Sequence, residues 1–291
     1  VENDRSVAKK VIALLYRETG RALVIGVTGP PGSGKSTLIG ALARQLTSNG
    51  KKTAIVAIDP TSMFSGGALL GDRIRMKEAA EDPNVYIRSM ATRGSTGGLS
   101  RAAADVVRVL DAASWNYVIV ETAGAGQTDL DIVNLAQTVV VVLSPGWGDE
   151  IQAFKAGLME IGDIFVVNKS DLKGANRTLL DVRSMLQTYG AERKWHPEVM
   201  LVDSIKPTGI DELRAAILKH HEYVSKSAPT KGGLKDGEAQ LIAAVRQELE
   251  LDFIPELRRT QAFSDYARQV AERLIDPYTA AGAVIEKARR S

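Results

Sequence analysis

The stretch GPPGSGKST, residues 29–37, decides the fold expected for this chain. It follows the apolar run ALVIGV and precedes LIGALARQL, so it lies where a buried strand turns into a helix. Its pattern, G-x-x-x-x-G-K-[ST], leaves successive backbone N–H groups facing a polyphosphate. Lys35 then supplies a cation to the outer phosphates, and the Ser36 hydroxyl is placed to ligate Mg²⁺. The stretch predicts a nucleoside triphosphate site made of Gly29, Pro30, Pro31, Gly32, Ser33, Gly34, Lys35, Ser36 and Thr37.

The composition limits the classes of protein to consider. The 291 residues are 44% hydrophobic, which allows one large core with a small helical appendage. The 37 Lys and Arg residues nearly balance 35 Asp and Glu residues, so neither nucleic acid nor an anionic membrane is an expected partner. The chain has no Cys, no apolar run of the roughly 18 residues that span a membrane, and no signal peptide at Val1. These features predict a cytoplasmic protein without disulfides or thiolate metal sites.

Short β-branched runs alternate with amphipathic stretches between residues 22 and 223. The runs are ALVIGV, KTAIVAI, VYIRS, YVIVE, TVVVVL, IFVVN and EVMLV. Because they are apolar throughout rather than alternating, they indicate parallel strands buried on both faces. We therefore expect an α/β fold of the P-loop NTPase type, with a mostly parallel sheet of about seven strands covered by helices.

The pattern divides the chain into four segments. Residues 1–21 form a helical extension with Ser6 as its expected cap, and residues 22–224 form the P-loop domain. Residues 225–238, SKSAPTKGGLKDGE, have the composition of a linker. Residues 239–291 indicate helices broken near Pro255 and Pro277. This last segment is too short to build its own core, so it must pack on the main domain or on another chain.

The tetrapeptide Asn168-Lys169-Ser170-Asp171 follows the sixth run and fits the pattern N-K-x-D. A carboxylate at Asp171 can accept hydrogen bonds from both the ring N–H and the exocyclic amine of guanine, whereas adenine presents the wrong pattern. Asn168 is expected to brace the loop, and the Lys169 stem to cover the base. Asp203 and Ser204, at the end of the last run, are the place where a backbone N–H would meet the guanine oxygen.

Three acids compete for the magnesium ion. Glu121 ends the buried run YVIVE, Asp59 ends KTAIVAI, and Asp72 follows the stretch PTSMFSGGALLG. Arg75, three residues after Asp72, could bring positive charge to the phosphates, with a solvated ion pair as the alternative. For each acid alone the alternative is a helix cap or a surface charge. We assign catalytic roles to Lys35, Glu121 and Arg75.

The residue that positions the attacking water is left unassigned. Gln127 invites comparison with the glutamine of small signalling GTPases, but Ala125 and Gly126 separate it from the equivalent glycine. Hydrolysis would proceed by in-line attack of water on the outer phosphorus, helped by Mg²⁺, Lys35 and loop N–H groups. We expect slow intrinsic turnover that a partner tunes by ordering mobile loops.

Together these motifs resemble the MeaB/ArgK-type P-loop GTPases, chaperones of adenosylcobalamin-dependent methylmalonyl-CoA mutase. The resemblance covers about residues 22–223. It rests on GPPGSGKSTL, AIDPTSMFSGGALLGDRIRM, IRSMATRGSTGGLS, VIVETAGAGQTD, PGWGDEIQAFKAG and FVVNKSD. These strings are far longer than generic nucleotide motifs, so they make the family assignment more specific than the P-loop alone does.

The resemblance implies a ligand set, a switch and a quaternary structure. GTP or GDP would be the ligand, and Arg75 would contact a phosphate. The C-terminal segment would be a dimerisation arm, which makes the protein a homodimer. Residues 144–157 would form a switch between chaperone and mutase, with Asp149, Glu150, Gln152 and Lys155 as its exposed residues and Ala156 where some relatives carry a second lysine. Mg²⁺ would be surrounded by Ser36, Asp59, Asp72 and Glu121, with Thr122 nearby.

Several alternative functions remain open at this point. One is a kinase of lysine, arginine and ornithine transport, and another is a nickel-insertion chaperone. The second needs metal ligands, yet the chain offers only His196, His220 and His221, of which we expect the last two to be solvated at a helix end. A third is a GTP-dependent binding module whose hydrolysis is only a timer. The client could also be an isobutyryl- or ethylmalonyl-CoA mutase.

Overall fold

The computed structural model describes residues 4–59, 76–91, 101–122, 124, 132–146, 157–189, 193–227 and 234–289. The chain divides into two compact units, Val1–Ser227 and Ala228–Ser291. No helix within these described ranges is long and apolar enough to cross a membrane.

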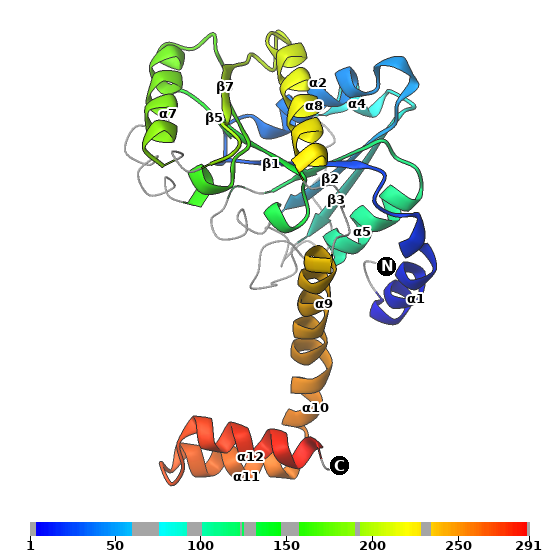
Figure 1. Cartoon of the computed structure of the whole chain (residues 1–291), viewed down its shortest axis with the longest axis vertical. Coiled ribbons are helices and arrows are strands. Elements are labelled where there is room, and N and C mark those ends of the chain that lie inside the picture. Colours follow the sequence, from blue (N-terminus) through cyan, green and yellow to red (C-terminus); the bar gives the residue numbers. More distant parts are fainter. Residues whose placement is uncertain are drawn as a thin grey trace. The chain divides into compact units, whose positions relative to one another are not determined.

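The first unit is built on a seven-stranded sheet in which every pairing is parallel (Figure 1). The strand order is β3-β2-β4-β1-β5-β6-β7, so β1 lies in the middle. This confirms the predicted α/β P-loop architecture. The strands are β1 Leu23–Thr28, β2 Thr53–Asp59, β3 Val85–Ala91, β4 Tyr117–Glu121, β5 Thr138–Leu143, β6 Ile164–Val167 and β7 Glu198–Leu201.

Helices cover the sheet on both faces. On one face α2 (Lys35–Leu46), α4 (Lys77–Ala80) and α8 (Ile210–Ser227) contribute to a single apolar cluster with alternate residues of the strands. On the other face α5 (Arg101–Ala112) and α7 (Ala175–Tyr189) pack in two further clusters. Burial on both faces explains why the strands are continuously apolar in sequence.

The N-terminal helix α1, Arg5–Leu15, begins before Ser6, its expected cap. Asp4 is the N-cap, because its Oδ1 accepts hydrogen bonds from the N–H groups of Ser6 and Val7. The prediction of Ser6 as the cap is therefore wrong. A carboxylate at this position satisfies two N–H donors of the first turn and places negative charge at the positive end of the helix dipole.

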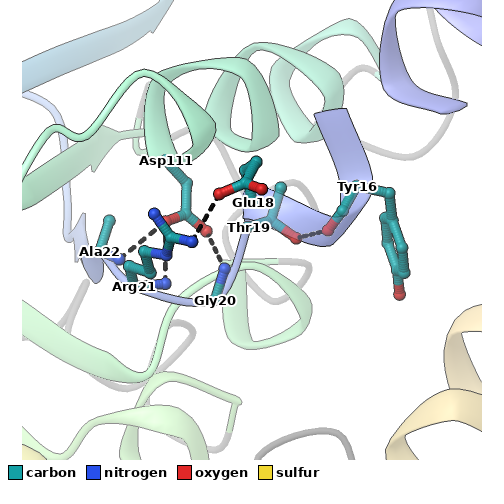
Figure 2. A network of polar contacts seen from close by, with 7 residues as sticks. All are labelled: Tyr16, Glu18, Thr19, Gly20, Arg21, Ala22 and Asp111. Atoms are coloured by element: carbon teal, nitrogen blue, oxygen red, sulfur yellow. Dashed lines mark hydrogen bonds and ion pairs between the residues drawn. The ribbon is translucent and has the colours of Figure 1, made fainter. Parts of the chain in front are cut away.

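A buried carboxylate joins this extension to the sheet (Figure 2). Asp111, near the end of α5, accepts hydrogen bonds from the backbone N–H groups of Gly20, Arg21 and Ala22 at 2.5, 3.0 and 2.7 Å. These residues connect the 3₁₀ turn Tyr16–Glu18 to β1. Three successive N–H groups around one anion form a strong charge-assisted contact, which holds the start of the central strand against α5.

His220, in the middle of α8, is buried rather than solvated, so the prediction for it is wrong. Its Nδ1 lies 2.9 Å from Thr138 Oγ1 and its Nε2 lies 3.4 Å from Asp163 Oδ1. The Trp195 ring packs edge-on against it, with a centroid distance of 4.7 Å. Burial lowers the pKa of His220 to about 4, and the neighbouring charge of His221 acts in the same direction.

The pKa of Asp163 is shifted in the opposite direction. Burial raises its pKa to about 6, against the opposing effects of a hydrogen bond from the Val139 N–H and the charge of Arg193. Neutral His220 therefore stabilises the fold above pH 6.5, and that stability is lost as the pH falls toward 4. Protonated Asp163 stabilises it at low pH, and that stability is lost as the pH rises through 6. The two pH dependences oppose each other.

Single substitutions should reveal these opposing slopes. In Asp163→Asn the free energy of unfolding should fall by about 2 kcal/mol between pH 7 and pH 4.5, and in His220→Gln it should fall by about 2 kcal/mol between pH 4.5 and pH 7. Urea unfolding followed by Trp fluorescence measures both, with the double variant as the reference. Parallel pH profiles in the two single variants would contradict the assignment.

The second unit consists of helices only, within its described residues. They are α9 Leu234–Glu248, a π-helical turn Leu249–Phe253, α10 Ile254–Arg258, α11 Gln261–Ala271 and α12 Pro277–Arg289. Helix α8 reaches Ser227 and α9 begins at Leu234, so both extend into the segment predicted as a linker.

The expected helix break near Pro255 is absent. The chain stays helical from α9 through α10, because the π turn just before Pro255 accommodates the proline without interrupting the helix (Figure 1). The chain leaves the helix further on, where Thr260 caps α11. Pro277 does mark a boundary, since it is the first residue of α12.

Candidate nucleotide site

The loop between β1 and α2 has the backbone geometry of a phosphate loop. Gly32 and Gly34 have φ of +77° and +89°, in the left-handed region that favours glycine. Gly29, with φ of +138°, lies so close to β5 that a Cβ there would stand 2.1 Å from the Val142 carbonyl oxygen. Helix α2 begins directly after Gly34, so the N–H groups of its first turn face the loop, where an anion is stabilised.

Lys35 lies folded over the loop. Its Nζ donates hydrogen bonds to the carbonyl oxygens of Gly29 at 2.8 Å and Pro30 at 3.1 Å, and its side chain is buried. These bonds hold a positive charge above the N–H groups of the loop. The sequence predicted that Lys35 supplies positive charge to the phosphates, and the position of its Nζ over the loop is suited to that role.

Ser36 and Glu121 meet at the carboxyl ends of two neighbouring strands. The Ser36 hydroxyl donates a 2.7 Å hydrogen bond to Glu121 Oε1, and both residues are buried. Strands β1 and β4 pair directly, and Glu121 is the last residue of β4. A hydroxyl and a carboxylate oxygen side by side are hard ligands that suit Mg²⁺. The donor set present therefore fits the metal implied by the sequence.

The other expected metal ligands differ in how far the structure defines them. Asp59 is the last residue of β2. It follows two residues after Ala57, which pairs with Glu121 on β4. The backbone positions of Asp59 and Glu121 therefore lie at the same edge of the sheet. The side chain of Asp59 lies outside the description, as do Asp72 and Arg75 altogether. The Thr122 hydroxyl donates to Thr28 Oγ1 at 3.0 Å and its N–H donates to the Val27 carbonyl. Thr122 thus contacts β1 in this structure.

Gly124 is a site residue to which the sequence analysis assigned no role. Its φ is +75°, and a Cβ on it would stand 2.1 Å from the Gly29 carbonyl oxygen and 2.7 Å from Lys35 Nζ. The chain that leaves β4 therefore lies directly on the phosphate loop. Its place three residues after Glu121 was the available signal, but the contact with Lys35 needed the tertiary structure.

Asn168 joins two loops. Its Nδ2 donates to the Ser33 carbonyl oxygen at 2.9 Å, while its Oδ1 accepts from the Ser204 N–H at 3.2 Å. The side chain is fully buried, so both contacts are made away from water. Lys169, with φ of +57°, donates from Nζ to the Gly32 carbonyl oxygen at 2.7 Å. The N-K-x-D loop is thereby tied to the phosphate loop through two side chains.

The residues expected to contact the guanine base differ in their exposure to solvent. Asp171 is exposed at the start of the loop that leads to α7. Asp203 is buried, and its Oδ1 accepts from the N–H groups of Ile205 and Lys206 at 2.9 and 3.1 Å. The N–H of Asp203 donates to the Thr208 carbonyl and that of Ser204 to Asn168. Both N–H groups proposed for the guanine oxygen are therefore engaged within the protein, where they shape the loop.

The predicted switch lies largely outside the described residues. Ser144, Pro145 and Gly146 follow β5, and the description resumes at Gly157. Residues 147–156, which include the expected Asp149, Glu150, Gln152, Lys155 and Ala156, are not described, and neither is Gln127.

The comparisons with known proteins agree on one family. A family model described as Methylmalonyl Co-A mutase-associated GTPase MeaB matches residues 1–255. A protein of Pyrococcus abyssi that is named as a GTPase is 42% identical over 290 residues, 99% of this chain and 90% of that protein. The GTPase ArgK of Escherichia coli is 34% identical over 273 residues, 91% of this chain and 80% of its own.

A methylmalonic aciduria type A homolog of Caenorhabditis elegans is also similar, with 37% identity over 220 residues, 73% of this chain and 55% of that protein. Among solved structures, an LAO/AO transport system kinase matches with a TM-score of 0.70 and 24% identity, over 98% of this chain and 87% of its own. HypB from Helicobacter pylori in complex with nickel matches with a TM-score of 0.52 and 19% identity, over 75% of this chain and 94% of its own. At these identities the two structures show the fold alone.

The family resemblance drawn from the sequence motifs is thus confirmed, and the phosphate loop, Glu121 and the N-K-x-D loop are brought together at one edge of the sheet. This chain belongs to the MeaB family of methylmalonyl-CoA mutase-associated GTPases.

Proposed function

We propose that this GTPase binds GTP or GDP with Mg²⁺, hydrolyses GTP, and acts as a chaperone that gates adenosylcobalamin loading and protection of methylmalonyl-CoA mutase or a related acyl-CoA mutase. The observation that carries the nucleotide part is the set of contacts that join Lys35, Glu121 and Asn168 to one loop. The client is supported by the family, whose name refers to the mutase.

The chain's own residues perform most of the proposed hydrolysis by positioning and by charge. The first-turn N–H groups of α2 bind phosphate oxygens, and the Lys35 ammonium moves from the Gly29 and Pro30 carbonyl oxygens to the outer phosphates. The Ser36 hydroxyl and the Glu121 carboxylate would hold Mg²⁺, which would supply positive charge to neutralise the phosphates. Water then attacks the outer phosphorus in line, the bond from that phosphorus to the bridging oxygen breaks, and the products are GDP and inorganic phosphate.

Guanine selection by Asp171 can be tested with a single atom change. Asp171→Asn should weaken GTP binding at least about a hundredfold and raise affinity for xanthosine triphosphate, because the amide offers a donor where the carboxylate offered an acceptor. Isothermal titration with both nucleotides measures the shift. Asp181→Asn on the exposed side of α7 is the matched control. Unchanged GTP affinity in Asp171→Asn would remove Asp171 from the site.

The mutase part of the proposal is tested by steady-state hydrolysis of GTP, with ATP as the control nucleotide. Each candidate acyl-CoA mutase is added in its apo and cofactor-loaded forms. Acceleration by one mutase would identify the client. If no mutase binds or changes the rate, the GTPase assignment stands and the chaperone proposal fails.

A metal-insertion role is less well supported. No group of three or more His, Cys, Asp or Glu residues that could hold a metal ion occurs within the described part of the chain. His220, one of three histidines, lies buried beside Thr138 and Asp163. The transport-kinase alternative is supported only by a solved structure that is 24% identical, which shows the fold alone.

We also propose that the second unit is a homodimerisation arm. Residues of α10, α11 and α12 line a partly open apolar cavity of about 330 Å³, which we call the hairpin cavity. It is lined by Leu257, Phe263, Tyr266, Ala267, Val270, Pro277, Ala280, Ala281, Val284 and Ile285. An apolar hollow with exposed apolar neighbours is typical of a surface that another protein covers.

A further inference from the structure

The helix that runs from α9 into α10 carries an apolar series with a period of four residues. Its members are Leu241, Val245, Leu249, Phe253 and Leu257. In a regular α-helix each step of four advances the side chain by about 40°, so Leu257 would lie about 160° from Leu241. Such a series would wind around to the opposite side of the helix. An uninterrupted α-helix therefore could not use these residues as one face.

The π turn corrects this drift. The Ile254 N–H donates to the Leu249 carbonyl five residues earlier, instead of four. The turn takes up one extra residue, which is about 100° of α-helical rotation. Leu257 then lies about 60° from Leu241, within one apolar face. The π turn makes a period-four series behave as a continuous stripe.

Pro255 explains why the π turn lies where it does. Proline has no N–H, and in a regular α-helix its ring would meet the carbonyl of residue 251. A wider turn directly before the proline relieves this contact while the helix continues into α10. The proline and the apolar series therefore favour the same local geometry.

The stripe continues into the hairpin cavity, because Leu257 belongs to both. Leu241, Val245 and Leu249 are 63%, 49% and 45% exposed. Among the described residues of the second unit, only Ala280 and Val284 are buried hydrophobic residues. A helical unit with so small a core needs a further apolar surface to pack against.

We propose that the π turn at Leu249–Phe253 sets the phase that joins the stripe to the hairpin cavity, and that the joined surface packs against the same surface of a second copy. This inference rests on the dimerisation arm proposed above. Charge supports self-association: Glu248, Glu250, Asp252 and Glu256 precede Arg258 and Arg259. In a two-fold antiparallel pair the acidic stretch of one copy lies beside the arginines of the other.

The test compares two variants of the full chain that both lack the π turn. The in-phase variant combines Pro255→Ala and Asp252→Asn with deletion of Glu250, which leaves a regular α-helix with the stripe aligned. The out-of-phase variant combines Pro255→Ala and Asp252→Asn with Glu250→Gln and keeps every residue, so a regular α-helix places Leu257 about 160° from Leu241, about 100° further than in the in-phase variant. Both remove the same two acidic charges and differ by one residue. Far-UV circular dichroism and GTP hydrolysis verify that each variant is folded.

Sedimentation equilibrium gives the dimer Kd of each variant. We expect the in-phase variant to keep a Kd within about threefold of the wild type, and the out-of-phase variant to raise it at least about a hundredfold. If the wild type is a dimer and the two variants associate equally, the phase inference is overturned. The same follows if the wild type is a dimer and the in-phase variant dissociates. In both cases the proposal of a dimerisation arm still stands. A monomeric wild type would overturn the proposed arm, and the phase inference with it.

Discussion

Replacement of Gly124 by alanine should lower the rate of GTP hydrolysis at least about a hundredfold. The new Cβ would stand 2.1 Å from the Gly29 carbonyl oxygen and 2.7 Å from Lys35 Nζ, so the chain after β4, the phosphate loop or the lysine must move. Phosphoryl transfer depends mainly on positioning and charge, and a displacement of about 1 Å at this lysine costs about two orders of magnitude. Single-turnover hydrolysis of GTP measures the effect.

Gly50→Ala provides a matched control for this experiment. Gly50 has φ of +74°, nearly that of Gly124, but nothing lies within 4 Å of a Cβ placed on it. Both variants carry the backbone strain of alanine in the left-handed region, which costs about 1 kcal/mol of stability. Only Gly124→Ala adds the clash with the phosphate loop. Equal hydrolysis rates in the two variants would show that Gly124 does not position Lys35.

Asn168→Ala should weaken nucleotide binding about a hundredfold and lower the free energy of unfolding by about 2–4 kcal/mol. The substitution removes the 2.9 Å bond to the Ser33 carbonyl and leaves the buried Ser204 N–H without its 3.2 Å partner. The phosphate loop then loses its link to the N-K-x-D loop. Calorimetric nucleotide titration and urea unfolding measure the two losses.

Two further variants separate the bonds of Asn168. Asn168→Asp keeps an acceptor for the Ser204 N–H but has no donor for the Ser33 carbonyl, so it should lose nucleotide affinity as strongly as the alanine variant. Asn176→Ala on the exposed surface of α7 should change neither quantity. If Asn168→Asp bound nucleotide like the wild type, the bond to the phosphate loop would have no part in the site.

The sequence predicted much of the site because its chemistry is local. The glycines, Lys35 and Ser36 occur in one short stretch between a strand and a helix, and a phosphate loop needs only such a stretch. Glu121 could be added because the carboxyl ends of parallel strands meet at one edge, and the register of β1 and β4 brings it to Ser36. The seven continuous apolar runs predicted the buried parallel sheet for the same reason.

Long-range contacts were not predictable in the same way. His220 was expected in solvent because two histidines at a helix end usually are, yet Thr138, Asp163 and Trp195 enclose it. Gly124 has no side chain to take part in chemistry, and its spacing after Glu121 did not reveal that it contacts Lys35. The helix break expected at Pro255 is absent because a π turn accommodates the ring, whereas the expectation considered only that proline ends a regular α-helix.

The sequence by itself determined the fold class, the phosphate loop and the family. The phosphate loop and the family motifs depend on residues that are neighbours along the chain, and the fold class depends on apolar runs that alternate regularly with amphipathic stretches. The tertiary structure alone decided which loops touch. Asn168 reaches Ser33 across 135 positions of sequence, and Asp111 reaches Gly20 across 91. Such contacts follow from how the helices pack on the sheet, because a buried polar group takes whichever partner the packing brings within hydrogen-bond distance.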